Sequence, residues 1–256
     1  MMGQASFDLI VIGAGQAGPF LAAKLAHAGK KVALIEARQL GGTCVNRGCT
    51  PTKTLRKSAR VAYMARRAAE FGVDVGPVTV NFGVAMARMR KRITDARTGL
   101  EGWLGALPGL TIHYAHGQLA GRDGADFIVQ AGEHTLRAPQ VVLNTGTRSF
   151  MPPIPGLSTV PALDSEGLLA LDELPKKLVI IGGGYISLEM AQIFRRLGAE
   201  VSVIENNPRL TSREDLDVSA AITDLLLSEG IEVITGAKVE SVQPGDLPGH
   251  SRVQLT

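Results

Sequence analysis

Two short runs of apolar residues give the chain its clearest pattern. Leu9–Ile12 and Leu178–Ile181 are rich in branched side chains and each is followed by a glycine, as buried parallel strands are. Apolar residues at helical spacing follow each run for roughly four turns and stop at Gly29 or Gly198, before a second apolar run. Two strand–helix–strand units of this kind predict an α/β fold with doubly wound sheets.

The two units are copies of one another. Residues 7–36 align without gaps with residues 176–205, at a constant offset of 169. The first copy carries the pattern GxGxxG at Gly13, Gly15 and Gly18. The first glycine permits a tight turn, the second lets a pyrophosphate approach the helix N-terminus, and the third lets the helix pack closely on the strand. Glu36 ends the next strand, where its carboxylate can accept hydrogen bonds from ribose hydroxyls, so we expect a dinucleotide site here.

The second copy keeps two of the glycines and the acid, at Gly182, Gly184 and Glu205. Ser187 replaces the third glycine and is small enough to pack there. A carboxylate at Glu205 repels a 2′-phosphate, which favours NADH over NADPH. Arg209 follows closely and is long enough to reach such a phosphate, so the sequence leaves this preference open.

The segment between the copies mixes helical and strand patterns. Residues 54 to about 70 and 81 to about 107 are expected to be helices, the second capped by Asn81. The second helix carries apolar residues on one side: Met89, Ile93, Leu100, Trp103, Leu104 and Leu107. Three short strands are then predicted, at Thr111–Tyr114, Phe127–Gln130 and Val141–Asn144.

Composition narrows the class of protein. The chain has 256 residues, of which 45% are hydrophobic, enough for a buried core in one large or two moderate domains. A net charge of +3 with mixed signs predicts no nucleic-acid or membrane partner, and the basic stretch Arg88–Arg92 is expected to be a solvated helix face. Glycines and Lys24 argue against an export signal or membrane span at Leu9–Ala26. We expect a cytoplasmic location.

The chain has two cysteines, Cys44 and Cys49, five residues apart. Thiols are kept reduced in the cytoplasm, so the pair is more consistent with redox chemistry than with a structural staple. In an ideal helix such Cα atoms are about 8.7 Å apart, whereas a disulfide needs roughly 4.4–6.8 Å. A bond between them requires a distorted backbone, which Gly48 and Pro51 permit. We expect no metal site, because further ligands with fitting spacing are lacking.

Residues 41–53, GGTCVNRGCTPTK, resemble the redox-active motif of the pyridine nucleotide-disulfide oxidoreductases, most closely their mercuric-reductase-like, FAD-containing branch. The order of motifs agrees with that family along the whole chain. The resemblance implies a FAD-binding domain with a β-meander at 1–156, which the three short strands resemble. It further implies an incomplete NAD(P)-binding domain at 157–256, with the dimerisation domain absent. A homodimer is expected of the full-length protein.

The resemblance also implies roles for individual residues. Cys49 is expected to face the flavin and Cys44 to exchange with substrate. Lys53 and Glu189 are expected to form an ion pair near flavin N5, and Tyr185 to cover the nicotinamide. Further cofactor contacts are expected at Gly42, Thr43, Gly117, Thr145, Gly146 and Ile186.

Two questions stay open from the sequence. A helix could begin near Thr50 and place its positive end beside Cys49, or, as in the family, begin earlier and bend through the motif. The acceptor is also open. Mercuric ion suits the branch that the motif resembles, although Tyr185 is aromatic where mercuric reductases commonly are not. The alternatives are a lipoamide-dehydrogenase-like activity on small disulfides and a non-catalytic fragment that binds flavin or nucleotide.

Overall fold

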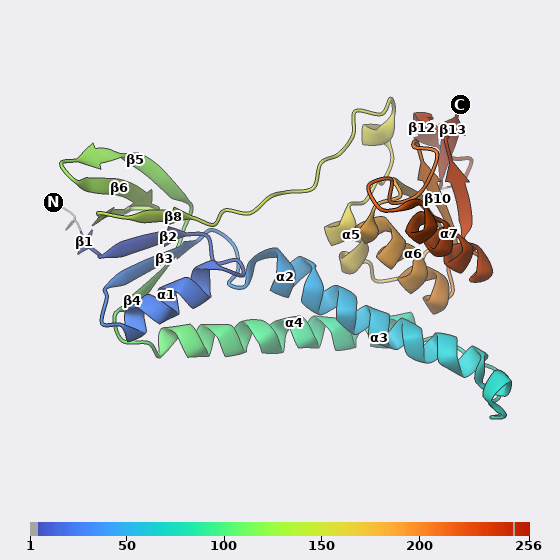
Figure 1. Ribbon diagram of the computed structural model, residues 1–256, viewed down its shortest axis with the longest axis horizontal. Helices are drawn as coiled ribbons and strands as arrows, with labels where there is room; N and C mark the ends of the chain where they lie inside the picture. Colours follow the sequence, from blue (N-terminus) through green and yellow to red (C-terminus); the bar gives the residue numbers. More distant parts are fainter. Residues whose placement is uncertain (1–4, 248) are drawn as a thin grey trace. The chain divides into compact units, whose positions relative to one another are not determined.

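We describe a computed structural model of the chain, covering residues 5–247 and 249–256. It folds as two compact units (Figure 1). The first unit comprises the described residues up to Pro51 together with Met89–Arg148, and the second comprises Thr52–Arg88 with Ser149–Thr256. The predicted domain boundary at residue 156 stays a prediction, since these units divide the chain at other positions as well.

The first unit contains a four-stranded parallel sheet in the order β4-β3-β2-β8. Its strands are β4 (Leu110–Tyr114), β3 (Val32–Glu36), β2 (Leu9–Ile12) and β8 (Val141–Leu143). The register pairs Leu9 with Val32 and Ile10 with Val141. The first copy of the duplicated unit is therefore central in its sheet, with a neighbouring strand on each side of β2.

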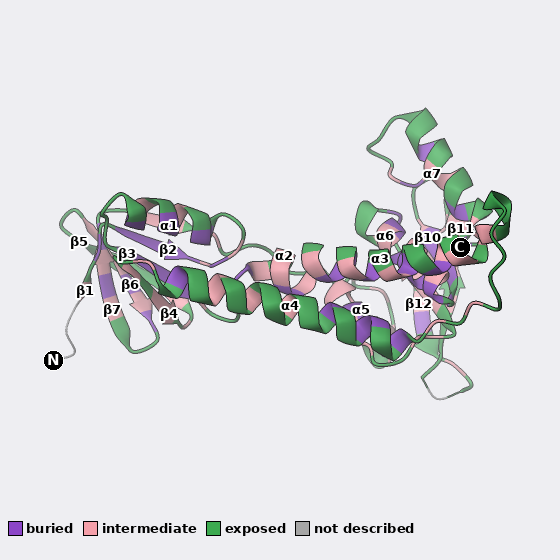
Figure 2. Cartoon of the chain, turned by 90° about the horizontal axis from the view of Figure 1, so that it is seen from below, coloured by how far each residue is buried: buried purple, intermediate pink, exposed green. Residues whose placement is uncertain are grey.

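Both faces of this sheet are covered, which explains why β2 is apolar at every position. Leu9 and Val11 pack with Ala22 and Ala23 of α1 (Gly18–His27). The alternate residues Ile10 and Ile12 pack against a second sheet. Figure 2 shows the buried core of this unit as purple segments along β2.

The second sheet of this unit has the order β1-β7-β6-β5, in which the last three strands form an antiparallel meander. Its strands are β1 (Ala5–Ser6), β5 (Gly117–Asp123), β6 (Asp126–Ala131) and β7 (His134–Ala138). The predicted assignment of Thr111–Tyr114 and Val141–Asn144 to the meander is wrong. Those residues form β4 and β8 of the parallel sheet, because pairing with distant strands decides which sheet a short apolar strand joins.

The second unit contains a three-stranded parallel sheet in the order β11-β10-β9. Its strands are β9 (Lys177–Ile181), β10 (Glu200–Glu205) and β11 (Glu232–Thr235). Helix α6 (Tyr185–Leu197) follows β9, and α7 (Leu216–Ser228) follows β10. The unit also contains the short helices η2 (Leu157–Thr159) and α5 (Ser165–Ala170), and the antiparallel pair β12 (Val239–Pro244) and β13 (Ser251–Leu255).

Helices α3 (Cys49–Arg66) and α4 (Phe82–Gly105) confirm the two predicted helical segments with shifted ends. The short helices α2 (Gly42–Arg47) and η1 (Ala68–Phe71) flank α3. Asn81 caps α4, since its Oδ1 accepts a hydrogen bond from Val84 N at 3.0 Å. Arg88 is exposed, and its Nη1 donates to Thr54 O at 2.9 Å.

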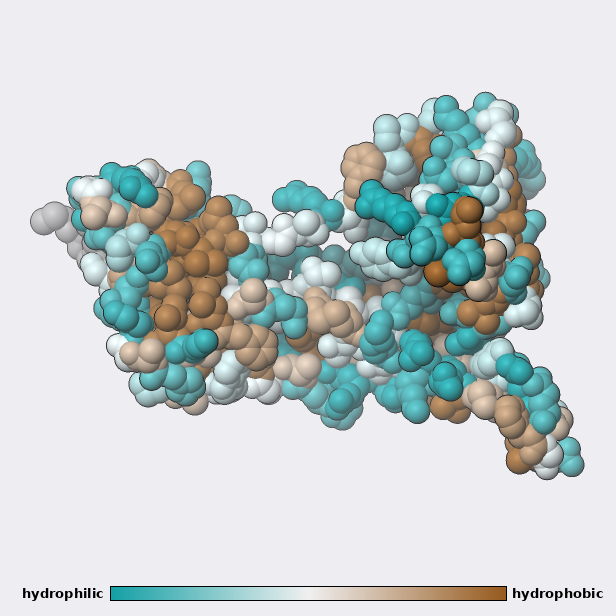
Figure 3. Space-filling view, viewed as in Figure 1, coloured by the Kyte–Doolittle hydropathy of each residue, from teal (hydrophilic) through white to brown (hydrophobic). Residues whose placement is uncertain are grey.

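The surface carries both apolar and polar areas. Figure 3 shows a broad apolar area over the sheets of the first unit. Exposed apolar side chains of that unit include Tyr114, Leu119 and Leu143. Within the described residues, every helix is too short or too polar to cross a bilayer.

Candidate functional site

The first glycine turn lies between β2 and α1 and is closed on one side by Asn144. Gly13 has φ +103°, and its N–H donates to Ile35 O at 2.8 Å. Asn144 Nδ2 donates to Gly13 O at 3.0 Å. A Cβ at Gly13 would lie 2.2 Å from Asn144 O, so only glycine fits between β2 and the residue that follows β8.

The N-terminus of α1 is available to an anion. Its N-cap is Ala17, whose methyl cannot accept a hydrogen bond from the helix. A Cβ at Gly18 would lie 2.3 Å from Gly13 O, which explains the third glycine by packing. At Gly15 the nearest protein atom to a Cβ would be 3.4 Å away, so packing gives no strong reason for a glycine there. Close approach of a ligand supplies one.

Glu36 holds the first turn from the end of β3. Its Oε2 accepts from Ala14 N at 2.8 Å, and its Oε1 accepts from Arg38 N at 2.8 Å. A carboxylate has about four lone-pair directions. Glu36 therefore keeps acceptor capacity for hydroxyl groups.

The second glycine turn repeats these contacts at the same offset. Gly182 has φ +101°, and its N–H donates to Ile204 O at 2.7 Å. Glu205 Oε2 accepts from Gly183 N at 2.6 Å and Oε1 from Asn207 N at 2.7 Å. The N-cap of α6 is Gly184, where a Cβ would meet no described atom within 4 Å. The duplication read from the sequence thus extends to individual hydrogen bonds.

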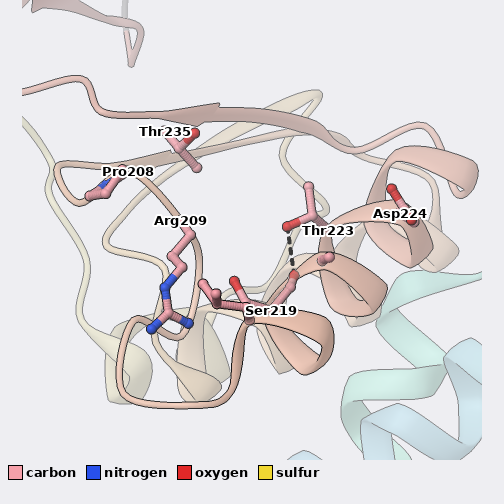
Figure 4. A pocket seen from close by; sticks show the side chains of 8 residues that line it. Pro208, Arg209, Ser219, Thr223, Asp224 and Thr235 are labelled. Carbon is pink, nitrogen blue, oxygen red and sulfur yellow. Dashed lines mark hydrogen bonds between the residues drawn. The ribbon is translucent and has the colours of Figure 1, made fainter.

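The side chain of Arg209, the residue that could reach a 2′-phosphate, instead bonds to the backbone of the loop that follows it. Its Nη1 donates to Glu214 O at 2.6 Å and its Nη2 to Ser212 O at 2.7 Å. The same arginine lines a cavity of about 280 Å³ between this loop, α7 and the end of β11. Figure 4 shows Thr223 donating to the backbone of Ser219 on α7, beside Arg209 and Thr235.

The two cysteines form a disulfide across a broken helix. The Cα atoms of Cys44 and Cys49 are 4.6 Å apart, in the range that a disulfide needs. Helix α2 ends at Arg47, the backbone leaves helical geometry at Gly48 (φ −131°, ψ −106°), and α3 begins at Cys49. The structure combines the two alternatives left open: one helix begins early, at Gly42, and after the break at Gly48 a second helix begins at Cys49, next to Thr50.

Helix α2 is fastened to the first glycine turn. Gly41 N donates to Ala14 O at 2.8 Å, and Gln16 Nε2 donates to Gly41 O at 3.4 Å. A Cβ at Gly42 would lie 2.6 Å from Gly15 Cα, so the two backbones are in direct contact. Asn46, which is 9% exposed, donates from Nδ2 to Leu40 O and Gly42 O, both at 2.9 Å.

In the second unit, Lys53 and Glu189 meet as expected. Lys53 Nζ lies 2.6 Å from Glu189 Oε1, which joins α3 to α6. Tyr185 begins α6 with 80% of its surface exposed, and Ile186 is 46% exposed. Both side chains are accessible beside the second glycine turn.

The other predicted cofactor contacts lie in the first unit. Thr43 is exposed on α2, Thr145 is exposed after β8, and Gly146 has φ +68°. Gly117 begins β5, where a Cβ would lie 2.9 Å from Ile12 Cγ2, so packing accounts for this glycine. Sequence reasoning missed Asn144 and Asn46, whose side chains fasten the glycine turn and the dithiol helix. Their places beside glycine motifs were the only available signal.

A family model described as pyridine nucleotide-disulphide oxidoreductase matches residues 7–255. The chain belongs to the pyridine nucleotide-disulphide oxidoreductase family. It is 36% identical over 255 residues to a dihydrolipoyl dehydrogenase of Chlamydia muridarum, covering 98% of this chain and 53% of that protein. It is 33% identical over 246 residues to a mercuric reductase of Bacillus cereus, covering 96% and 38%.

Solved structures agree with this family. The HOCl-induced flavoprotein disulfide reductase RclA from Escherichia coli matches with a TM-score of 0.82 and 32% identity, covering 96% of this chain and 52% of that one. The chain spans about half the length of the dihydrolipoyl dehydrogenase and of RclA, and 38% of the mercuric reductase. The mixed α/β fold with parallel sheets, expected from the sequence, is confirmed.

Proposed function

We propose that the chain is the electron-transferring part of a FAD-dependent oxidoreductase, in which electrons pass from NAD(P)H through FAD to the Cys44–Cys49 disulfide. The observation that carries this proposal is the direct contact between the dithiol helix and the first glycine turn, where Gly42 abuts Gly15. A dinucleotide held on that turn would lie beside the helix that bears the disulfide. The relatives of this chain are named as a dihydrolipoyl dehydrogenase and a mercuric reductase, and both names support the same class of reaction.

The residues of the first turn fit FAD. Helix α1 offers uncapped N–H groups and a glycine without a strong packing role, as a pyrophosphate requires. Glu36 keeps lone pairs for ribose hydroxyls. Thr145 and Gly146 follow β8 in the same unit and are proposed to contact the flavin moiety. When bound, FAD accepts hydride from the nicotinamide and returns electrons one pair at a time.

The disulfide would receive that pair. Two electrons and one proton open the S–S bond to one thiol and one thiolate, and an acceptor closes it again by taking the pair. Cys49 begins α3, where the positive end of the helix favours a thiolate. We propose that Cys49 faces the flavin and that Cys44 exchanges with the acceptor.

Lys53 and Glu189 would supply charge to the same reaction. The ammonium of Lys53 is held by Glu189 at 2.6 Å. Placed near flavin N5, a cation stabilises negative charge that develops on the ring during reduction. We propose this role for Lys53, with Glu189 as its orienting partner and Tyr185 and Ile186 as cover for the nicotinamide.

We propose NADH as the preferred nucleotide of the second turn. Glu205 is fixed by the amides of Gly183 and Asn207 and by Asn207 Nδ2 at 2.6 Å, so a carboxylate occupies the place where a 2′-phosphate would need a cation. The guanidinium of Arg209 is engaged with two backbone carbonyls. Binding NADPH would require Arg209 to leave them.

We propose two candidate electron acceptors for the disulfide. Mercuric ion follows the branch that the motif resembles, and small disulfides follow the dihydrolipoyl dehydrogenases among the relatives. The exposed aromatic at Tyr185 favours the disulfide. The two are distinguished by the steady-state rate of NADH oxidation by the whole protein, measured once with lipoamide and once with Hg²⁺ as the acceptor. The homodimer and the cytoplasmic location stay predictions.

The test is anaerobic two-electron reduction of the FAD-loaded chain, followed by absorbance beyond the main flavin bands. We expect a long-wavelength charge-transfer band from the Cys49 thiolate to oxidised FAD, because the electron pair comes to rest on the opened disulfide. The band should be absent in Cys49→Ser and present in Cys44→Ser before any reduction, since that variant has no disulfide to open. A reduced, FAD-loaded sample without the band, or one in which Cys49→Ser changes nothing, would contradict the proposal. A chain that binds FAD but whose disulfide stays closed would instead be a non-catalytic flavin-binding fragment.

A further inference from the structure

A group of aromatic and charged side chains joins α3 to α6 beyond the Lys53–Glu189 pair. Tyr63 lies three helical turns after Lys53 on α3, and Arg196 lies two turns after Glu189 on α6. The guanidinium carbon of Arg196 lies 4.5 Å from the centroid of the Tyr63 ring, and that of Arg67 lies 4.9 Å from it. Both distances suit cation–π attraction. Arg67 also donates to the Tyr63 hydroxyl.

Arg196 is held from its other side by a buried carboxylate. Its Nε donates to Glu229 Oε2 at 2.7 Å and its Nη2 to Glu229 Oε1 at 2.5 Å. The two side chains are 15% and 3% exposed. Gln192 Nε2 adds a hydrogen bond to Glu229 Oε1 at 2.8 Å. A planar guanidinium bound at two points has a fixed orientation, so its ring contact with Tyr63 is fixed as well.

A second link runs from α3 to the backbone of α6. Arg66 Nη1 donates to Arg196 O at 2.5 Å. This carbonyl belongs to the last turn of α6, where carbonyls have no partner within the helix and carry the negative end of its dipole. We call Tyr63, Arg66, Arg196 and Glu229 together the Arg196 clamp.

The Lys53–Glu189 pair cannot set the packing of two helices by itself. Its side chains are 63% and 30% exposed, and exposed ion pairs add little to stability. Apolar residues of α3, among them Leu55 and Ala59, are buried, but hydrophobic attraction has no preferred direction. The buried Arg196–Glu229 pair orients Arg196 from the end of α7, and Arg196 meets α3 through the Tyr63 ring and the hydrogen bond from Arg66. The directional restraint on α3 against α6 therefore lies in these two contacts.

We propose that the Arg196 clamp is a positioning device that sets the register of α3 on α6 and so brings the Lys53 ammonium onto Glu189. Arg196 and Tyr63 act through Lys53 and contact no reacting atom. Their effect on the ion pair does not depend on any cofactor. The consequence for the flavin rests on the proposed function, because it requires that Lys53 serve the reducible ring.

The test measures how fast Lys53 is acetylated by acetic anhydride at mild alkaline pH, relative to Lys57. Lys57 lies one turn later on α3 and is exposed, so the ratio cancels a general loosening of the helix. Glu189→Gln should raise the ratio about two- to five-fold, the range that an exposed pair supports. Tyr63→Leu should raise it by a similar factor, whereas Tyr63→Phe, which keeps the ring over Arg196, should leave it at the wild-type value.

Arg66→Met provides a variant that keeps the buried pair intact. Arg66 is exposed, so its replacement does not threaten folding, and we expect a smaller rise in the Lys53 ratio. A wild-type ratio in both Tyr63→Leu and Arg66→Met, with a raised ratio in Glu189→Gln, would overturn the proposal. An unchanged ratio in Glu189→Gln would overturn its premise, the ion pair itself.

The proposed effect of the clamp on the flavin is tested by measuring the reduction potential of bound FAD. Lys53→Met should lower the potential, because removing a cation disfavours the reduced, more negative ring. Tyr63→Leu should lower it in the same direction by a smaller amount. A raised labelling ratio with no change of potential would contradict the link to the flavin and leave the clamp's effect on the pair standing. Failure of the proposed function shows separately, as absence of FAD-dependent reduction of the disulfide.

Discussion

The two copies of the nucleotide-binding turn share their backbone and differ in their surroundings. In the first copy Asn144 donates to Gly13 O, and the dithiol helix contacts Gly15 through Gly42. In the second, a Cβ at Gly182 or Gly184 would meet no described atom within 4 Å. Between these two glycines, a Cβ at Gly183 would lie 2.6 Å from Leu210 Cδ2, so the second turn is open at Gly182 and Gly184 only. We propose that the more enclosed first turn holds the cofactor that stays bound and that the second takes the exchanging nucleotide.

The largest expected difference between the copies concerns Gly13→Ala and Gly182→Ala. Both positions need a positive φ, which costs an alanine about 1–2 kcal/mol. At Gly13 the new methyl would also meet Asn144 O at 2.2 Å, so we expect a total of about 4 kcal/mol or more there. Urea unfolding followed by Trp103 fluorescence reports the first unit, and far-UV circular dichroism reports both. Equal losses in the two variants would show that the enclosure does not constrain the turn.

A smaller difference is expected from the side chains that support each turn. Asn144→Ala removes the hydrogen bond to Gly13 O and leaves a part-buried carbonyl without it, at a cost of about 1–2 kcal/mol. Asn207→Ala removes an exposed contact with Glu205 Oε1 and should cost about 0.5 kcal/mol or less. The same unfolding measurement compares them. A larger loss in Asn207→Ala would reverse the assignment of the enclosed turn.

The smallest expected effect is a loss of stability of the first unit as the pH falls. Burial, with a smaller contribution from neighbouring His134, lowers the pKa of His113 below its ordinary value of 6.5. The unfolded chain then binds a proton that the folded unit refuses, so stability falls as pH drops through 6.5 towards the folded pKa. His113→Leu should flatten this dependence in Trp103-detected unfolding. An unchanged slope in His113→Leu would contradict it.

The sequence predicted the elements that local patterns determine. The apolar runs before Gly13 and Gly182, the helices after them and the break at Gly48 follow from residue type and spacing. Strand partnership was not predictable in this way. Val141–Leu143 and Phe127–Gln130 look alike locally, yet one pairs in the parallel sheet with β2 and the other in the meander with its neighbours. Strands β5 and β7 were missed because glycine and charged residues interrupt their alternation.

Contacts between residues far apart in the chain could not be predicted from the sequence either. Asn144 closes a turn 131 residues earlier in the chain, and Arg196 meets Tyr63 across a comparable separation. Neither partner is implied by local spacing. The Lys53–Glu189 pair could be expected only because a whole family arrangement was recognised.

The most direct test of the account compares Gly15→Ala with Gly184→Ala, which occupy equivalent positions in the two copies. The fold has room for a methyl at both, so neither change should unfold the chain. The methyl at Gly15 should weaken FAD binding at least ten-fold and leave NADH binding unchanged, and the methyl at Gly184 should do the reverse, roughly 1.4 kcal/mol or more in each case. Titration of each variant with FAD and with NADH measures this. Loss of FAD binding in Gly184→Ala, with Gly15→Ala unaffected, would contradict the assignment of the enclosed turn to FAD.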